Sequence, residues 1–283
     1  MRRRDYWLRR IQALDPVADH WEIYRISAGY EFPWDYQRSL ELALFRTYCV
    51  PSISALLAET GEFRDRPQKR YDDTALLMAE LAAHGYDSDR GREALRIINR
   101  AHGRFQIAPA DMRYVLSTFV YDPIDWIDRH GWRRLSDQER LAAFHFYRQV
   151  GLRMGIRDVP EDFHAFRAFK TEYERAAFRY ADTNREIGQY TLELLCGWYP
   201  RPLRPVVRLG VRGLLDAPMR TAFGFAAAPK WAVGATNAAL GLRAAVVRRL
   251  PVRTINRLAR DPRNRTYPGY PDGYRLDDLG VRP

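Results

Sequence analysis

The chain has 283 residues, 46% of them hydrophobic, which is enough for a sizeable core in one large domain or two small ones. Its two cysteines, Cys49 and Cys196, stand in no CxxC or similar pair. This excludes a disulfide framework or a zinc ribbon as the basis of the fold and favours a reducing compartment.

The net charge of +11 is concentrated in the last third of the chain. Residues 201–283 hold 16 Lys and Arg against 5 Asp and Glu, whereas residues 1–200 hold 30 of each. We therefore predict a charge-balanced domain over 1–200 and a basic extension over 201–283, packed on or beside it. A basic segment can face nucleic acid, anionic lipid or water alone, and charge by itself leaves all three open.

The N-terminal MRRRDYWLRR is positively charged but leads into no apolar run. It is therefore not a secretory signal, and cytoplasmic residence is the default expectation.

Apolar residues recur at helical spacing almost throughout the chain, and strand-like alternation is hard to find. The sequence therefore predicts an all-α fold. Helices are expected from Pro33 to the stop at Pro51, over 72–84, from Asp87 or Ser88 to Gly103, from Pro109 to a break or kink at Pro123, over 136–154, and from Pro160 to about Trp198.

Two helix starts have specific capping signals. Asp72, Asp73 or Thr74 is the expected N-cap of the second helix, and Ser136 with Glu139 forms the pattern of a capping box.

The residue pattern changes after Tyr199. Arg204, Arg208 and Arg212 lie four residues apart with apolar residues between them, a basic amphipathic helix pattern. The stretch 221–242 is nearly free of charge but rich in Ala and Gly and interrupted by Pro229, so it is a poor membrane span. From Asp261 onward we expect an irregular surface tail.

Most catalytic signatures are absent from the sequence: it has no GxSxG, GxxxxGK[ST], HExxH or GxGxxG motif and no Cys/His metal spacing. A kinase, a dehydrogenase or a metalloprotease is therefore disfavoured.

His102 is the histidine with the most unusual surroundings. It shares one helical face with Leu95 and Ile98, and Arg100 and Arg104 flank it in the sequence. A neutral imidazole on an apolar face, with arginines near enough to meet propionates, is what a haem requires. A structurally satisfied core histidine is the alternative.

Three stretches carry a family resemblance: KRYDDTALLMAEL, the region from Asp87 to Arg140, and FYRQVGLRMGIRDVP. In motif order and spacing they resemble the MpaB-type oxygenases, a family that includes the rubber oxygenase, or latex clearing protein, catalytic domain. The resemblance covers about residues 65–200.

The resemblance implies a globin-like helical core that binds one haem b and uses dioxygen to cleave a C=C bond in an isoprenoid chain. In the rubber oxygenases an Arg-x-x-x-Thr motif precedes the proximal histidine. Arg70 and Thr74 match that motif, and His102 follows at nearly the same interval. His102 becomes the expected iron ligand, Arg70 a residue of the hydrogen-bond network or a propionate partner, and Thr74 a distal residue near bound oxygen.

Two positions depart from the rubber oxygenases. Asp73 stands where the rubber oxygenases have a lysine. Those enzymes also have a distal glutamate, and Glu59 and Glu62 are the only candidates for its counterpart. Asp73 is a candidate distal polar group, with the helix N-cap as its structural alternative.

The expected function is a haem b-dependent oxygenase that cleaves or oxidises a C=C bond with O2 in an apolar, isoprenoid-like substrate. The predicted catalytic residues are Thr74, Arg70 and Asp73, and the predicted haem partners are His102, Arg70, Arg100 and Arg104. The alternative is a haem-binding or haem-free protein of the same fold without oxygenase activity. Peripheral membrane contact through the basic segment is expected, and nucleic-acid binding is not.

Overall fold

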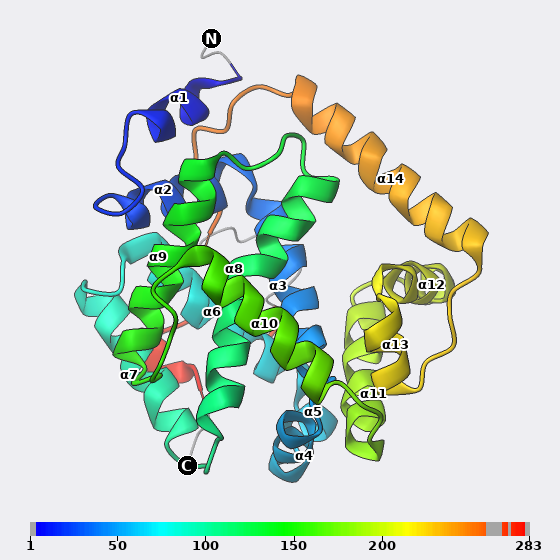
Figure 1. Cartoon of the computed structure of the whole chain (residues 1–283). Helices are drawn as coiled ribbons and strands as arrows, with labels where there is room; N and C mark the ends of the chain where they lie inside the picture. Colours follow the sequence, from blue (N-terminus) through cyan, green and yellow to red (C-terminus); the bar gives the residue numbers. More distant parts are fainter. Residues whose placement is uncertain (1–3, 259–267, 271–272, 281–283) are drawn as a thin grey trace.

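The computed structural model describes residues 4–258, 268–270 and 273–280, and within these ranges the chain forms helices and no strand (Figure 1). The predicted all-α class is confirmed. The α-helices are α1 (Tyr6–Gln12), α2 (His20–Ile26), α3 (Pro33–Thr47), α4 (Pro51–Thr60), α5 (Glu62–Asp65), α6 (Pro67–His84), α7 (Asp89–His102), α8 (Pro109–His130), α9 (Asp137–Arg153), α10 (Phe163–Ala177), α11 (Asp182–Gly197), α12 (Arg204–Leu214), α13 (Ala217–Phe223) and α14 (Lys230–Arg249).

The body is a helical bundle in which segments distant in sequence pair. Helix α3 packs along α8 and α2 packs along α9, while α6 and α7 form a hairpin beside them. This arrangement is a helical bundle, as expected. It also means that the helices carrying Thr74 and His102 are neighbours.

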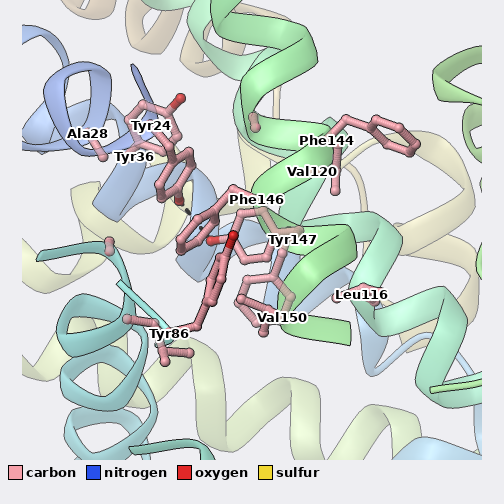
Figure 2. Close-up of a cluster of buried hydrophobic side chains, with 14 of the residues drawn as sticks. Tyr24, Ala28, Tyr36, Tyr86, Leu116, Val120, Phe144, Phe146, Tyr147 and Val150 are labelled. Carbon is pink, nitrogen blue, oxygen red and sulfur yellow. Dashed lines mark hydrogen bonds between the residues drawn. The ribbon is translucent and has the colours of Figure 1, made fainter. Parts of the chain in front are cut away.

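Aromatic side chains fill the centre of the bundle (Figure 2). The ring of Tyr24 stacks on Phe146 with centroids 4.3 Å apart, and its hydroxyl lies 2.8 Å from that of Tyr147 in a buried hydrogen bond. A buried hydroxyl without a hydrogen-bond partner destabilises a protein. The bond between Tyr24 and Tyr147 gives each of the two buried hydroxyls a partner.

Several predicted helix ends are confirmed by the caps that the structure forms. The Ser88 hydroxyl accepts a hydrogen bond from Gly91 N at 3.0 Å at the start of α7. Ser136 and Glu139 form the full capping box at the start of α9. Both caps satisfy backbone donors that a helix leaves free at its first turn.

Two predicted helix features are wrong. Helix α6 begins at Pro67, so Asp72, Asp73 and Thr74 lie inside it and none of them is its N-cap. Proline suits a first helical position because its φ is already helical and the N–H that it lacks would have no partner there.

The helix that begins at Pro109 is not broken at Pro123, since α8 continues to His130 with the proline inside it, and the kink at Pro123 stays a prediction. The expected helix from Pro160 to Trp198 is divided into α10 and α11. The side chain of Asn184 donates to the carbonyl of Arg179 at 2.8 Å and holds the chain between these two helices.

The C-terminal extension shares a core with the body. Leu215, Met219 and Phe223 pack with Phe45 of α3 and Ile187 of α11 in one buried cluster. The predicted basic amphipathic helix is confirmed as α12. Cys49 and Cys196 are free thiols, as the sequence predicted.

Helix α14 runs along the outer edge of the molecule (Figure 1). Arg243 joins it to the body through two contacts with the buried carboxylate of Asp35, at 2.8 and 3.0 Å. Of the expected surface tail, residues 268–270 and 273–280 lie within the described part, and they pack against α6 and α7.

In the described part of the chain, length and hydropathy qualify no single helix as a membrane span. The pair α3 and α4, bent by 99° at their junction, meets the same criteria only when the two helices are taken together.

Candidate functional site

A cavity of about 80 Å³ lies between α3 and α6. Apolar and aromatic side chains dominate its wall: Tyr24, Ala28, Pro33, Tyr36, Leu40, Leu44, Tyr71, Ala75, Met78, Ala79, Ala82, Phe119, Tyr147 and Leu258. The polar side chains of Gln37, Glu41, Thr74 and Arg257 complete it.

Three of the predicted site residues come together around Arg70. Its Nη1 donates a hydrogen bond to the Thr74 hydroxyl one turn later on α6, and that hydroxyl in turn donates to the Arg70 carbonyl at 3.1 Å. The Arg70 cation also lies close enough to His102 of α7 to lower the pKa of its imidazole. Thr74 lines the cavity, whereas His102 lies outside its wall.

The His102 ring is held in its neutral form. Burial lowers the pKa of His102 to about 4, and the Arg70 cation lowers it in the same direction, while the Ile98 carbonyl acts weakly in the opposite sense. Its Nδ1 is buried and forms no hydrogen bond of normal geometry among the described residues, although the Ile98 carbonyl lies near enough to the ring to act on its pKa. A neutral imidazole with a free nitrogen is a competent metal ligand.

Arg70 is a cation without a carboxylate partner among the described residues, although most partly buried arginines of this chain have one. Its guanidinium lies 5.9 Å from the Phe63 ring centroid. A partly buried guanidinium that is not neutralised by the protein can pair with an anionic group of a ligand.

Arg100 and Arg104 lie away from this cluster. They line a separate hollow with Glu93 and Ile97 of α7 and Leu279 of the C-terminal tail. Residues 93, 97, 100 and 101 share a face of α7, and Arg104 follows the end of the helix, whereas His102 lies on the face of Leu95 and Ile98. The structure therefore does not bring these two arginines to the side of α7 where His102 lies.

Asp73 also points away from the cavity. Its Oδ2 lies 2.5 Å from Lys69 Nζ, and its Oδ1 accepts a hydrogen bond from the Tyr270 hydroxyl at 2.7 Å. Lys69 continues to the carbonyl of Gly280 at 2.9 Å. In this structure Asp73 fastens the C-terminal tail to α6, whereas the side chain of the next residue, Thr74, bonds to Arg70 and lines the cavity.

The structure brings an acidic residue to the cavity that the sequence reasoning missed. Glu41 of α3 lines the wall, with 8% of its side chain exposed. Burial raises the pKa of Glu41 to about 7, although Arg38, 2.6 Å away, and a hydrogen bond from Tyr71 act to lower it. The signal in the sequence was the position of Glu41 between Leu40 and Leu42, because a carboxylate between two leucines of a helix can be partly buried.

Glu59 and Glu62, the acidic candidates taken from the sequence, do not line the cavity. Glu59 is exposed on α4, and Glu62 pairs with Arg66 at 2.5 Å.

The residues present are compatible with a haem group. The unpartnered buried nitrogen of His102, its neutral state and the unpaired Arg70 cation are the donor set that an iron porphyrin and one propionate would use. The described residues contain no cluster of three or more His, Cys, Asp or Glu side chains suited to a bare metal ion. Haem needs none, because the porphyrin supplies four of its ligands.

Comparison with known proteins gives matches over most of the chain. The family model described as "ER-bound oxygenase mpaB/B'/Rubber oxygenase, catalytic domain" matches residues 40–249. That match crosses the boundary predicted at residue 200.

Three curated relatives carry the same kind of name. The ER-bound oxygenase mpaB of Penicillium roqueforti is 30% identical over 220 residues, which are 71% of this chain and 74% of the relative. The ER-bound oxygenase mpaB' of Penicillium brevicompactum is 30% identical over 229 residues, 74% of this chain and 54% of the relative. The mpaB of Penicillium brevicompactum is 37% identical over 141 residues, 47% of this chain and 36% of the relative.

Proposed function

Because this chain belongs to the ER-bound oxygenase mpaB and rubber oxygenase family, and is thus an oxidoreductase, we propose that it is a haem b-dependent oxygenase acting on an apolar, isoprenoid-like substrate. The reaction that we propose is the cleavage or oxidation of a C=C bond by O2. In the cleavage reaction one dioxygen and one alkene give two carbonyl groups. Both oxygen atoms enter the products, and no external reductant is consumed.

One observation carries the proposal: Arg70 contacts Thr74 at the cavity and lowers the pKa of the neutral His102 imidazole, whose buried Nδ1 forms no hydrogen bond of normal geometry among the described residues. In this proposal His102 binds the iron, Arg70 pairs with a propionate, and the haem supplies the activation of dioxygen. Thr74 places a hydroxyl at the cavity wall, and when a ligand binds it can exchange its bond to the Arg70 carbonyl for one donated to a bound polar atom.

The remaining cavity wall explains the choice of an apolar substrate. Leucine, methionine, alanine and aromatic side chains dominate it, and they exclude water from an alkene lying there. Glu41 is the acidic group in this wall, and its raised pKa allows it to hold a proton near neutral pH.

The cellular setting is part of the same proposal. The matched relatives are named ER-bound, and this chain has a basic C-terminal extension with amphipathic helix α12. We propose a cytoplasmic enzyme with peripheral membrane contact through that extension.

The test is the absorption spectrum of the purified protein, followed by oxygen uptake with farnesyl and polyprenyl compounds. We expect a Soret band that is lost in His102→Ala and kept in His164→Ala, because His164 is exposed on α10. Alkene-dependent oxygen uptake should accompany the band. A folded, colourless protein after expression with a haem supply would contradict the proposal.

The alternative is a haem-binding or haem-free protein of this fold without oxygenase activity. The use of Asp73 as a fastening for the C-terminal tail favours this alternative, because the rubber oxygenases have a lysine at that position. A Soret band that depends on His102, without oxygen uptake on any alkene, would support the haem-binding form.

A further inference from the structure

Helix α14 is apolar on two opposite faces. Its inner face buries Ala232, Ala244 and Val247 against the protein. Its other face carries Trp231, Ala235, Ala238, Leu242 and Val246, which follow one another at intervals of three and four residues and are all exposed. We call these five residues the outer stripe of α14.

The outer stripe has no partner in the described part of the chain. Trp231 is 69% exposed, Leu242 68% and Val246 49%. An isolated exposed leucine is ordinary, but a continuous apolar stripe along a 20-residue helix is typical of a docking surface.

The charges around the stripe indicate an anionic partner. Residues 201–258 contain eleven Arg and Lys side chains and a single acidic residue, Asp216. Arg248 and Arg249 end α14 beside the stripe, and the exposed Arg204 lies on the neighbouring α12. None of these three arginines pairs with a carboxylate among the described residues.

The same segment reaches the cavity. After α14 the chain carries Leu250 and Ile255, which are 49% and 73% exposed, and then Arg257 and Leu258, which line the cavity wall. The backbone N–H of Arg257 donates to the Gly29 carbonyl at 3.1 Å and fixes this wall segment to the body. The docking stripe and the cavity wall therefore belong to one continuous stretch of chain.

We infer that the outer stripe of α14, with Arg248 and Arg249, docks on the surface of an anionic lipid bilayer. This inference deepens the proposed membrane contact by assigning it to one helix face. A second copy fits less well, because a symmetric pair would bring two unneutralised basic segments together. Nucleic acid would neutralise the arginines but leave the apolar stripe uncovered.

The experiment is flotation of the full chain with vesicles of phosphatidylcholine alone or mixed with phosphatidylserine, at low and high salt. We expect binding to the mixed vesicles that weakens with salt. The variant Leu242→Asp with Val246→Asp should bind about tenfold less or weaker still, because both charges would enter the apolar boundary. Arg248→Ala with Arg249→Ala should lose about tenfold, and only on anionic vesicles.

A matched control separates the stripe from general surface hydrophobicity. Val17 is 56% exposed in the segment before α2, so Val17→Asp should bind vesicles as the parent protein does. Circular dichroism of each variant confirms that the helices are intact.

The inference is overturned by unchanged flotation of the α14 stripe variant. It is also overturned by a dimer that this variant dissociates, or by binding to RNA with no binding to vesicles. The outcome is independent of the oxygenase proposal, because flotation is read without haem or substrate and the Soret band is read without lipid.

Discussion

Tyr71 on α6 donates a hydrogen bond to the carboxylate of Glu41 on α3, and both residues line the central cavity. Arg38 binds the same carboxylate at 2.6 Å from one turn earlier on α3. A donor and a cation thus hold Glu41 at the cavity wall, but burial still outweighs them in setting its pKa.

The first prediction concerns the pH dependence of stability at Glu41. Its pKa rises from 4.5 to about 7 on folding, so its contribution to stability is full below pH 4.5 and is lost as pH rises through 7. Glu41→Gln removes this loss. The free energy of unfolding of the variant, relative to the parent, should therefore increase by on the order of 2 kcal/mol between pH 4.5 and 8.

Denaturant unfolding at several pH values measures this difference, with Glu59→Gln as the control. Glu59 is exposed on α4, so its variant should differ from the parent by the same amount at each pH. A pH-independent difference for Glu41→Gln would show that the carboxylate is solvated in the folded protein.

The second prediction concerns the influence of Arg70 on His102. Arg70→Gln removes the cation, so the pKa of His102 should rise from about 4 while remaining below 6.5, because burial is the larger cause of its shift. An NMR titration of the haem-free protein measures it. Arg100→Gln is the control and should leave the pKa unchanged. Equal effects of the two variants would place Arg70 no nearer to His102 than Arg100 is.

The third prediction compares two buried tyrosines of the cavity wall. The Tyr36 hydroxyl is buried and forms no hydrogen bond of normal geometry among the described residues, with only the Ser27 hydroxyl acting on it, whereas the hydroxyl of Tyr24 bonds to that of Tyr147. Tyr36→Phe should change the free energy of unfolding by less than about 0.5 kcal/mol or stabilise the protein, and Tyr24→Phe should destabilise it by about 1–2 kcal/mol. Thermal or denaturant unfolding tests both, and equal destabilisation would mean that the Tyr36 hydroxyl has a partner after all.

The fourth prediction separates two roles for Asp73. If Asp73 only fastens the tail, Asp73→Ala should cost about 2 kcal/mol of stability, because Lys69 and Tyr270 lose their partner. Oxygen uptake per bound haem should not change. Thr74→Val is the comparison, and it should lower oxygen uptake while preserving the helix. Loss of uptake in Asp73→Ala at normal stability would instead support the catalytic role expected from the sequence.

Local signals account for most of the correct predictions. The helical spacing of apolar residues, the caps at Ser88 and Ser136 and the arginine spacing of α12 each act within one or two turns of chain. Such signals can be read without knowing the fold. The Arg-x-x-x-Thr pattern of Arg70 and Thr74 is equally local, and the structure joins the two by a hydrogen bond.

Asp73 and Pro123 show how tertiary contacts change what a local signal predicts. An acidic residue before an apolar run looks like an N-cap, but Pro67 had already started α6 and the carboxylate is bound by a tyrosine almost 200 residues later. Pro123 usually ends a helix, but α8 continues because most of its residues beyond the proline are buried in the core.

The sequence by itself determined the helical class, most of the helix ends, the basic character of the last third and the candidates Arg70, Thr74 and His102. Only the tertiary structure decided which of the candidates share a site, because that depends on which faces of α6 and α7 meet the bundle. It separated Arg100, Arg104 and Asp73 from that site and brought in Glu41 from α3. The physical reason is that burial and long-range contacts, not neighbours in sequence, set the charge state and partners of a side chain.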